Sequence, residues 1–448
     1  MTFQYFQHCV GRLRLPSALV NYSYRGAAFI CLAVLACTAV AADRALAGPT
    51  IVATGISSIM IPPVIDWHDR ILSVHIRNGA PSLVTCSGGQ VLDTLQPSQD
   101  LFGWTLSEYG VAYIQRPQNL YVHPAGGESQ FVYSAITSMG YLSMNDNGTL
   151  CYASRDTTHT LLNAMWIRQP DQSPVQLPSP TSGDWTVSKM AIDPSGNVYA
   201  GVSTSARADI YRWSNQGWTD LTASWSSSAG FAGMNRDGSQ IVFSSSEPGY
   251  KGLYQLRGDA ISQLGISYPT YASPKAKVAD NGSVLVYWHS YSFFGVPAKA
   301  YMYRPDGSVV DLDTVVPTGQ SLAAAIDNDD LDINHAGQVL LEAASTGPTG
   351  QLNDYYRYDG TTCEALLEST AGSVLHPAMC DDGMMYYYVW DSSGPTRTLT
   401  MAAIPEPTTL SLLVVAGIAL LGVATTCPHL ALNSTLGTLI YRRTRRVQ

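Results

Sequence analysis

The sequence predicts an all-β protein, a β-propeller of seven or eight four-stranded blades, from three features of residues 48–403. A short turn recurs, with one apolar residue, two or three polar residues and a glycine, and an apolar run follows each copy. The glycines of successive copies lie about 45 residues apart, which is within the range of propeller blades. A second, aromatic-rich hairpin follows most of these turns, so each unit has four antiparallel strands.

The recurring turn has the composition of a tight β-turn. Asn or Asp next to Gly tolerates positive φ values, and the β-branched and aromatic residues that follow suit a buried strand. Copies that carry Asn145, Asn235 or Asn334 three positions before the glycine resemble the tandem NxxG repeats of some exported proteins. The glycines of the seven copies are Gly110, Gly148, Gly196, Gly238, Gly282, Gly337 and Gly383.

The second hairpins and the two ends of the repeat region complete the predicted ring. A degenerate unit at residues 70–89 makes eight units fit residues 48–403 slightly better than seven. A late strand at residues 398–401 is expected to complete a blade that begins near residues 51–53. A pair of β-sandwiches or a β-solenoid are the alternatives, because both use glycine-punctuated strands. The second hairpins begin at Trp166, Tyr211, Tyr254, Tyr303 and Tyr356.

The N-terminus has the order of a secretory signal peptide. Arg12, Arg14 and Arg25 precede an uncharged apolar run at residues 27–42, and Ala-Leu-Ala at residues 45–47 forms a small-x-small cleavage site. We therefore expect residues 1–47 to be a signal peptide and residues 48–403 to be the β-propeller-like domain.

The C-terminus combines an extended link, an apolar segment and a basic end. Pro405 and Pro407 flank Glu406, which excludes a helix interior or a central strand. Residues 408–426 carry no charge, so we expect a transmembrane helix at about residues 409–426. The four arginines that follow should keep the C-terminus in the cytoplasm; they are Arg442, Arg443, Arg445 and Arg446.

Residues 404–448 resemble the PEP-CTERM sorting signal of Gram-negative bacteria, in which a Pro-Glu-Pro motif, a spanning helix and an arginine cluster are recognised by an exosortase. The resemblance implies a protein that is transiently anchored in the inner membrane and then exported to the cell envelope, the cell surface or the extracellular matrix. It also implies association with exopolysaccharide. Residues 427–429 interrupt the apolar run, unlike in the family, and an anchor that is never cleaved is the alternative.

Composition limits the partners of the domain. Charged residues make up 13% of the chain and the net charge is −9, so the sequence lacks the basic stripe that nucleic-acid binding requires. Export permits disulfides, and Cys363 could pair with Cys380, although buried thiols remain the alternative for these two and for Cys86 and Cys151.

No catalytic or cofactor motif is found, and we expect no cofactor apart from a calcium candidate. Asn328, Asp330 and Asp332 alternate as calcium ligands do, but the segment lacks the glycine and glutamate of an EF-hand loop. A solvated turn is the favoured alternative. Aromatic groups at residues 287–294 and 386–390 suit sugar stacking, yet the same residue types fill the space between blades, which we favour.

Three functions follow as hypotheses. The first is a non-enzymatic surface or matrix protein, with a propeller that binds a ligand such as polysaccharide or acts as a scaffold. The second is a polysaccharide hydrolase or lyase, which would place paired carboxylates roughly 5–10 Å apart in the propeller pocket. The third is a purely structural surface protein.

Overall fold

Strands dominate the part of the chain that the computed structural model describes. That part is residues 50–405, without 66–69, 78–79, 88–89, 116–117, 136–137, 156–161, 246, 248, 270–271, 273, 291–294, 323–325, 327–330, 348–349, 368–373, 381–383 and 392–397. The predicted signal peptide and transmembrane segment lie outside it. Within the described residues no helix has the length and apolar character needed to cross a membrane.

Six antiparallel sheets are each built from four consecutive strands, in chain order. The first three sheets contain β5 (Leu101–Ser107), β6 (Gly110–Gln115), β7 (Asn119–Pro124) and β8 (Gln130–Ser134); β9 (Met139–Met144), β10 (Leu150–Ser154), β11 (Ala164–Arg168) and β12 (Val175–Gln176); and β13 (Trp185–Ile192), β14 (Val198–Thr204), β15 (Ala208–Ser214) and β16 (Gly217–Asp220).

The next three sheets repeat the same order. They contain β17 (Gly230–Met234), β18 (Gln240–Ser245), β19 (Gly252–Arg257) and β20 (Ala260–Gln263); β21 (Lys275–Val278), β22 (Val284–Trp288), β23 (Lys299–Tyr303) and β24 (Val309–Asp311), followed by the 3-10 turn η2 (Leu312–Thr314); and β25 (Asp332–Ile333), β26 (Val339–Gly347), β27 (Gly350–Tyr358) and β28 (Cys363–Leu367).

The seventh sheet joins the two ends of the domain in the order β29-β30-β31-β1-β2-β3-β4. The long strand β1 pairs with β31 through its first residues, as in Ile51↔Ala402, and with β2 through its later ones, as in Ile65↔Ile71. The predicted closure by residues 398–401 is therefore confirmed. The strands are β1 (Thr50–Ile65), β2 (Ile71–Arg77), β3 (Ala80–Ser87), β4 (Gln90–Leu95), β29 (Val374–Met379), β30 (Met384–Asp391) and β31 (Thr398–Pro405).

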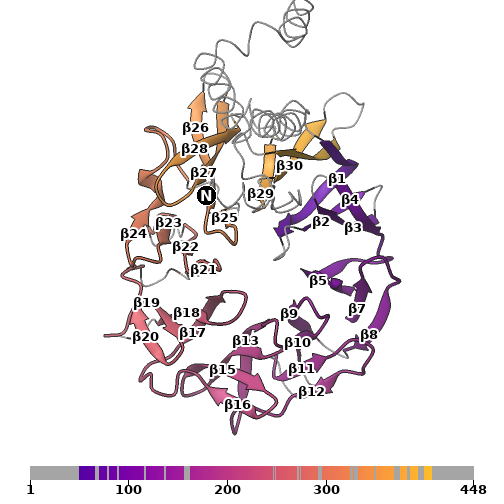
Figure 1. Cartoon of the computed structure of the whole chain (residues 1–448), viewed down its shortest axis with the longest axis vertical. Coiled ribbons are helices and arrows are strands. Elements are labelled where there is room, and N and C mark those ends of the chain that lie inside the picture. The colour runs from indigo at the N-terminus through magenta and orange to yellow at the C-terminus, as the bar shows by residue number, and fades with distance from the viewer. Residues whose placement is uncertain are drawn as a thin grey trace, which may run out of the picture. The chain divides into compact units, whose positions relative to one another are not determined.

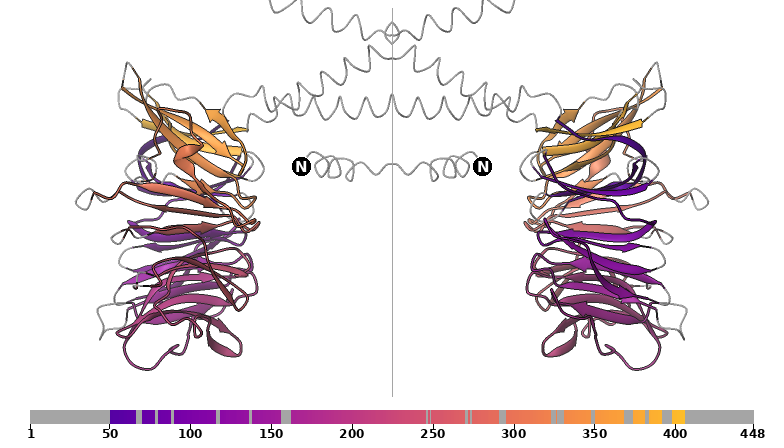
Figure 2. Two further views of the ribbon diagram at one scale, coloured as in Figure 1. Left: turned by 90° about the vertical axis from the view of Figure 1, so that its left-hand side faces the viewer. Right: turned by 90° about the vertical axis from the view of Figure 1, so that its right-hand side faces the viewer.

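From the sheet that begins with β5 to the sheet that begins with β29, the first strand of each sheet contacts the first strand of the next one. These contacts run from β5 through β9, β13, β17, β21 and β25 to β29, and β29 contacts β1. Figure 1 shows the resulting ring of sheets and Figure 2 shows it from two sides. The fold is thus a β-propeller, which confirms the prediction of four-stranded blades. Counted by hydrogen-bonded sheets it has seven blades, and the seventh contains two four-stranded sets that share β1.

A side-chain contact shows that the seventh sheet bends at β1. In a flat sheet β30 and β2 would lie three strand spacings apart, about 14 Å. Instead, the buried hydroxyls of Ser73 on β2 and Tyr388 on β30 are hydrogen-bonded, and Ser73 Oγ also lies 2.8 Å from His75 Nδ1. The two sets of strands therefore face one another.

The apolar cores lie between neighbouring sheets. All five residues of β22 are buried, and they alternate between two cores. Val284 and Val286 pack with Leu253 of β19, while Leu285 and Tyr287 pack with residues of the following sheet such as Leu341. A strand that is buried on both faces reads as a continuous apolar run, which explains the apolar runs after the repeat turns.

The repeat turns have one common geometry. In five copies the glycine has φ between +69° and +87°, and its N–H donates to the carbonyl three residues earlier. No Asn or Asp of these copies has a positive φ, so only the glycine adopts the left-handed conformation that we expected of both residues. The five glycines are Gly148, Gly196, Gly238, Gly282 and Gly337. The second hairpins are also confirmed, as β11–β12, β15–β16, β19–β20, β23–β24 and β27–β28.

Neighbouring turns are hydrogen-bonded to each other around one end of the ring. Asn145 Nδ2 donates to the Asp193 carbonyl at 3.0 Å, and Asn281 Nδ2 donates to the Ala336 carbonyl at 2.6 Å. The Arg236 N–H donates to Asp280 Oδ1 at 3.3 Å. The repeated polar residues therefore hold adjacent blades together as well as shaping their own turns.

Candidate functional site

The channel at the centre of the ring contains a cavity of about 360 Å³. Residues of six inner strands line it, from β5, β9, β13, β17, β21 and β25, together with the repeat turns that follow β9, β13, β17 and β25. This volume falls within the range of roughly 300–1,000 Å³ that is typical of ligand pockets. Because blades that are distant in sequence meet here, the cavity exists only in the closed ring.

Two cations of the channel are held by carboxylates. Arg236 Nη2 lies 2.5 Å from Asp146 Oδ2, and these residues follow β17 and β9, two sheets apart. Lys277 Nζ lies 2.8 Å from Asp332 Oδ1 and donates to the Leu331 carbonyl at 3.0 Å. These pairs fix the positions of two positive groups on the channel wall.

Lys189, on β13, has no carboxylate partner among the described residues. Its Nζ donates to the Ala232 carbonyl of β17 and lies 5.7 Å from the centroid of the Phe231 ring. Burial lowers the pKa of Lys189 to about 8, and the charges of Lys277 and Lys275 add to this effect. An anion placed beside Lys189 would stabilise its charge, so the site favours a negatively charged ligand.

Among the residues that the structure describes, the carboxylates expected of a glycoside hydrolase are not gathered here. Among the described residues that line the cavity, Asp146 is the only carboxylate, and Arg236 neutralises it. Paired acids that act on a glycosidic bond need one proton donor and one base or nucleophile. The described wall of the channel supplies cations instead.

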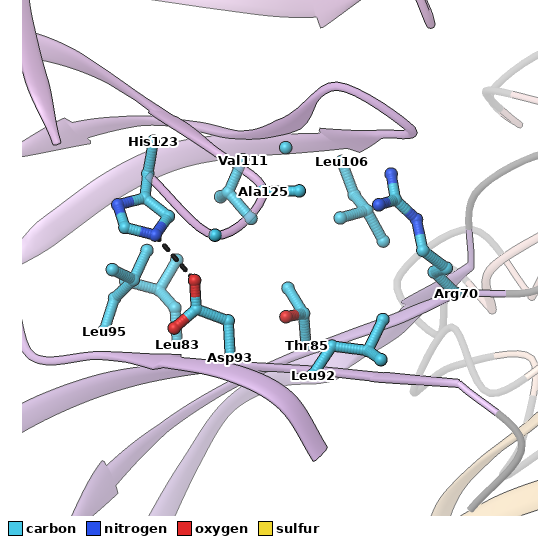
Figure 3. Close-up of a pocket in the computed structure, with 12 residues that line it drawn as sticks. Arg70, Leu83, Thr85, Leu92, Asp93, Leu95, Leu106, Val111, His123 and Ala125 are labelled. Carbon is cyan, nitrogen blue, oxygen red and sulfur yellow. Dashed lines mark hydrogen bonds and ion pairs between the residues drawn. The ribbon is translucent and has the colours of Figure 1, made fainter. Parts of the chain in front are cut away.

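A smaller cavity, of about 40 Å³, lies between β2–β4 and β5–β7. Figure 3 shows Asp93 and His123 facing each other across it, with Asp93 Oδ2 2.6 Å from His123 Nε2. His123 Nδ1 lies 3.1 Å from Ser129 Oγ, which also accepts from the Tyr113 hydroxyl at 3.2 Å. Ser, His and Asp form catalytic triads, but this serine does not line the cavity. We interpret this series of hydrogen bonds as a polar contact between two sheets.

The residues predicted for calcium are only partly described. Asn328 and Asp330 lie outside the described residues, and Asp332 opens β25, where its carboxylate accepts from Lys277. In the described part of the chain no group of three His, Cys, Asp or Glu residues is arranged to hold a metal.

The predicted sorting motif is also outside the described residues, apart from Pro405 at the end of β31. Glu406, Pro407 and the arginines Arg442, Arg443, Arg445 and Arg446 therefore remain predictions from the sequence. The same holds for the calcium candidates that the structure does not describe.

The aromatic groups have a packing role where the structure describes them. Tyr287 and Trp288 are 3% and 2% exposed, and Tyr386, Tyr387 and Tyr388 are at most 5% exposed. They fill the space between sheets, as the favoured interpretation predicted, and they are not available for sugar stacking. Tyr291, Phe293, Phe294 and the side chain of Trp390 lie outside the described part.

No disulfide joins the four described cysteines. Cys86 and Cys151 are fully buried in the cores, and burial raises the pKa of the Cys86 thiol to about 12. Cys363 is half-buried, with its pKa raised by burial. The thiol alternative is therefore the one that the structure shows, and the raised pKa values make these cysteines poor nucleophiles.

The three channel cations were missed in the sequence. Lys189 and Lys277 lie on strands and Arg236 lies in a repeat turn, positions where a polar residue usually faces solvent. One signal was present: Lys275 and Lys277 alternate along one short strand, so both point to the same side. Of these two lysines only Lys277 lines the cavity, and the cavity forms only in the ring.

No family model matches the chain, and no curated protein matches it either. Solved structures that are similar to it include a putative TolB from Agrobacterium tumefaciens, at 14% identity and a TM-score of 0.33, with 54% of this chain and 86% of that chain covered. An acylaminoacyl peptidase of Pyrococcus horikoshii has 12% identity and a TM-score of 0.43, covering 75% of this chain and 58% of the peptidase. A nidogen/laminin complex has 12% identity and a TM-score of 0.34, and the match covers 52% of this chain and 89% of the matched chain. The propeller fold of this chain therefore rests on its own strand pairing.

Proposed function

We propose that this protein is an exported binding protein of the cell surface or extracellular matrix, and that its central channel holds an acidic ligand such as a carboxylate-bearing exopolysaccharide. The observation that carries the proposal is Lys189, a cation that faces a cavity of about 360 Å³ without a carboxylate partner among the described residues. A protein with a net charge of −9 repels anions over most of its surface, so a cationic channel concentrates them at one place.

Binding is favoured over the two other functions by the composition of the channel wall. A polysaccharide hydrolase needs two acidic groups, whereas the described wall offers one acid, Asp146, already paired with Arg236. A purely structural protein has no need for the desolvated charge of Lys189, which lowers the stability of the fold. A ligand that compensates this charge gives the lysine a role.

The route to the surface is proposed from the two ends of the chain. The expected signal peptide at residues 1–47 and the Pro405-Glu406-Pro407 tail with its arginines support export followed by exosortase processing. Mass spectrometry of the mature protein, from hosts with and without an exosortase, tests this part. Loss of the residues after the Pro-Glu-Pro motif only in the host with the enzyme is expected, and an intact Gln448 in that host would contradict sorting.

Titration calorimetry of the full chain in mild detergent tests the binding site. We expect oligogalacturonate to bind and neutral dextran oligosaccharides of equal length not to bind. Lys189→Gln should weaken binding about tenfold, because one charge pair of this kind is worth about 1.4 kcal/mol, and added salt should weaken it further.

Lys299→Gln is the matched control. Lys299 Nζ lies 2.7 Å from Asp313 Oδ2 and 3.2 Å from Asp311 Oδ2, and it does not line the channel cavity. Its loss should leave the affinity unchanged. Equal affinity for acidic and neutral glycans, or an unchanged affinity of the Lys189 variant, would refute the channel site. Absence of binding to either glycan would leave the purely structural role ahead.

A further inference from the structure

We propose that Lys189 forms a reversible imine with an aldehyde or ketone that also carries a carboxylate, such as the open-chain reducing end of a uronic acid. This inference rests on the proposed anion-binding role of the channel and adds a covalent step to it. A site that only binds an anion needs the charge of Lys189, whereas the imine uses its amine as a nucleophile.

The position of the amine supports this chemistry. Lys189 lines a cavity that also presents Lys277, whereas Asp332, the partner of Lys277, does not line it, so the amine of Lys189 can meet the carbonyl carbon while Lys277 attracts the carboxylate. The Ala232 carbonyl accepts a hydrogen bond from Lys189 Nζ, and the Phe231 ring lies beside it. These contacts hold the side chain in one place on the channel wall, as a nucleophile requires.

The electrostatic surroundings favour the neutral, nucleophilic form of the amine. The charged groups that lower the pKa of Lys189 are Lys277 and Lys275 of β21, and burial has the larger effect. Of the other elements packed against β13, β17 carries no titratable side chain, while β9, β10 and β14 carry tyrosines and one cysteine, which are uncharged near neutral pH. Asp146 and Arg236 in the turns neutralise each other.

The proposed step is balanced without a redox partner. The neutral Nζ attacks the carbonyl carbon to give a carbinolamine, and this intermediate loses its hydroxyl as water while the C=N bond forms. The oxygen of that water comes from the carbonyl group, and its two protons come from the amine. Water in the channel reverses the reaction by adding to the imine.

The chain contains an internal control for this reactivity. It has five lysines, at positions 189, 251, 275, 277 and 299, so one peptide map can compare all of them. The hydrogen bonds that Lys299 donates to Asp313 and Asp311 raise the pKa of Lys299, which is the opposite effect to that on Lys189. Lys299 should therefore stay protonated where Lys189 is partly neutral.

Reductive trapping tests the proposal. The full chain is incubated with glyoxylate and cyanoborohydride at about pH 7, and carboxymethyl-lysine is quantified at each position by peptide mass spectrometry. We expect Lys189 to be labelled at least about tenfold faster than Lys299, with a rate that rises as the pH passes through 8. Labelling of Lys189 at or below the rate of Lys299 would overturn the proposal.

One variant and a second aldehyde separate this proposal from the proposed function. Lys189→Arg keeps a positive charge but cannot form an imine, so it should lose trapping at this position, while oligogalacturonate binding is measured separately on the wild-type chain without cyanoborohydride. Propionaldehyde, which lacks a carboxylate, should label wild-type Lys189 about tenfold more slowly than glyoxylate because the channel cations do not attract it. Binding of oligogalacturonate without trapping would leave the binding function standing and refute only the imine, whereas trapping that is equal for both aldehydes would refute the carboxylate requirement.

Discussion

At the scale of single residues, Lys189 shows how the fold sets the chemistry of a side chain. In the sequence it is one of five lysines, and nothing near it marks it as special. The structure places it in the channel, where burial and two neighbouring lysines lower its pKa to about 8. The sequence could not predict this, because a polar strand position that faces a channel looks the same as one that faces solvent.

The lowered pKa of Lys189 predicts a pH-dependent stability. An unfolded lysine has a pKa of about 10.4, so between pH 8 and this value the unfolded chain binds more protons, and the contribution of this group to the free energy of unfolding rises with pH. Below pH 8 both states are protonated and the folded state carries a desolvated charge. Lys189→Met should therefore stabilise the protein at pH 7 by about 1 kcal/mol. This value is smaller than the pKa shift alone would give, because the side chain is only half-buried and solvent screens its charge. The gain in stability should vanish above about pH 10.

Urea unfolding at several pH values measures this effect as a difference between variant and wild type. Lys299→Met is the control: Asp313 raises the pKa of Lys299, so its interactions stabilise the fold below the unfolded pKa and are lost as the pH rises through the folded one. This variant should lose stability at pH 7. The same sign of change for both variants would be inconsistent with the opposite surroundings of the two lysines.

At the scale of elements, the repeat turn is the feature that the sequence predicts best. The spacing of the glycines located the turns, and the aromatic strands located the second hairpins, because both signals depend on local backbone preferences. The bonds between turns of neighbouring blades were not predictable. Asn145 and Asn281 donate to carbonyls 48 and 55 residues away, and only the ring brings those groups together.

Two glycines of the repeat separate the roles of backbone conformation and packing. Gly238 has φ +69°, and a Cβ there would lie 2.4 Å from the Tyr199 hydroxyl of the preceding blade. Tyr199 is 4% exposed and its hydroxyl donates to Asp193 at 3.3 Å, so its side chain is held in place next to Gly238. Gly238→Ala should cost about 2–3 kcal/mol of unfolding free energy.

Gly196 is the matched control. It has φ +84°, but no atom lies within 4 Å of a Cβ built there. Gly196→Ala should cost only about 1 kcal/mol, which is the strain of a left-handed alanine. Urea unfolding of both variants gives the comparison, and equal losses would show that the contact between blades adds nothing to the requirement for glycine.

At the scale of the whole molecule, the sequence predicted the propeller, its four-stranded units and the closure of residues 398–401 onto residues 51–53. It could not predict that β1 would serve two sets of strands, because β1 changes partner at Ile56, a residue with no turn signal. The channel could not be predicted from the sequence for a related reason. Six strands, spread from Leu101 to Ile333, contribute to it, and no local pattern specifies that they converge.

The bend of the seventh sheet gives a prediction about how the ring is held closed. The Tyr388 hydroxyl is fully buried and hydrogen-bonded to Ser73, which joins the last strands of the domain to the first. Tyr388→Phe keeps the aromatic side chain but removes its hydrogen bond to Ser73. It should therefore lower the free energy of unfolding by about 1–2 kcal/mol. Ser73→Ala should do the same, and the double variant should cost less than the sum, because the two residues share one interaction.

Tyr152→Phe distinguishes this closure from the general effect of removing a buried hydroxyl. Tyr152 is also fully buried, but its hydroxyl has no hydrogen-bond partner among the described residues. Removing an unsatisfied polar group should leave stability unchanged or raise it by up to about 1 kcal/mol. If Tyr388→Phe and Tyr152→Phe changed urea unfolding by the same amount, the Ser73–Tyr388 contact would not be a stabilising link between the two ends of the propeller. A loss confined to Tyr388→Phe would show that ring closure depends on this pair as well as on the strands β31 and β1.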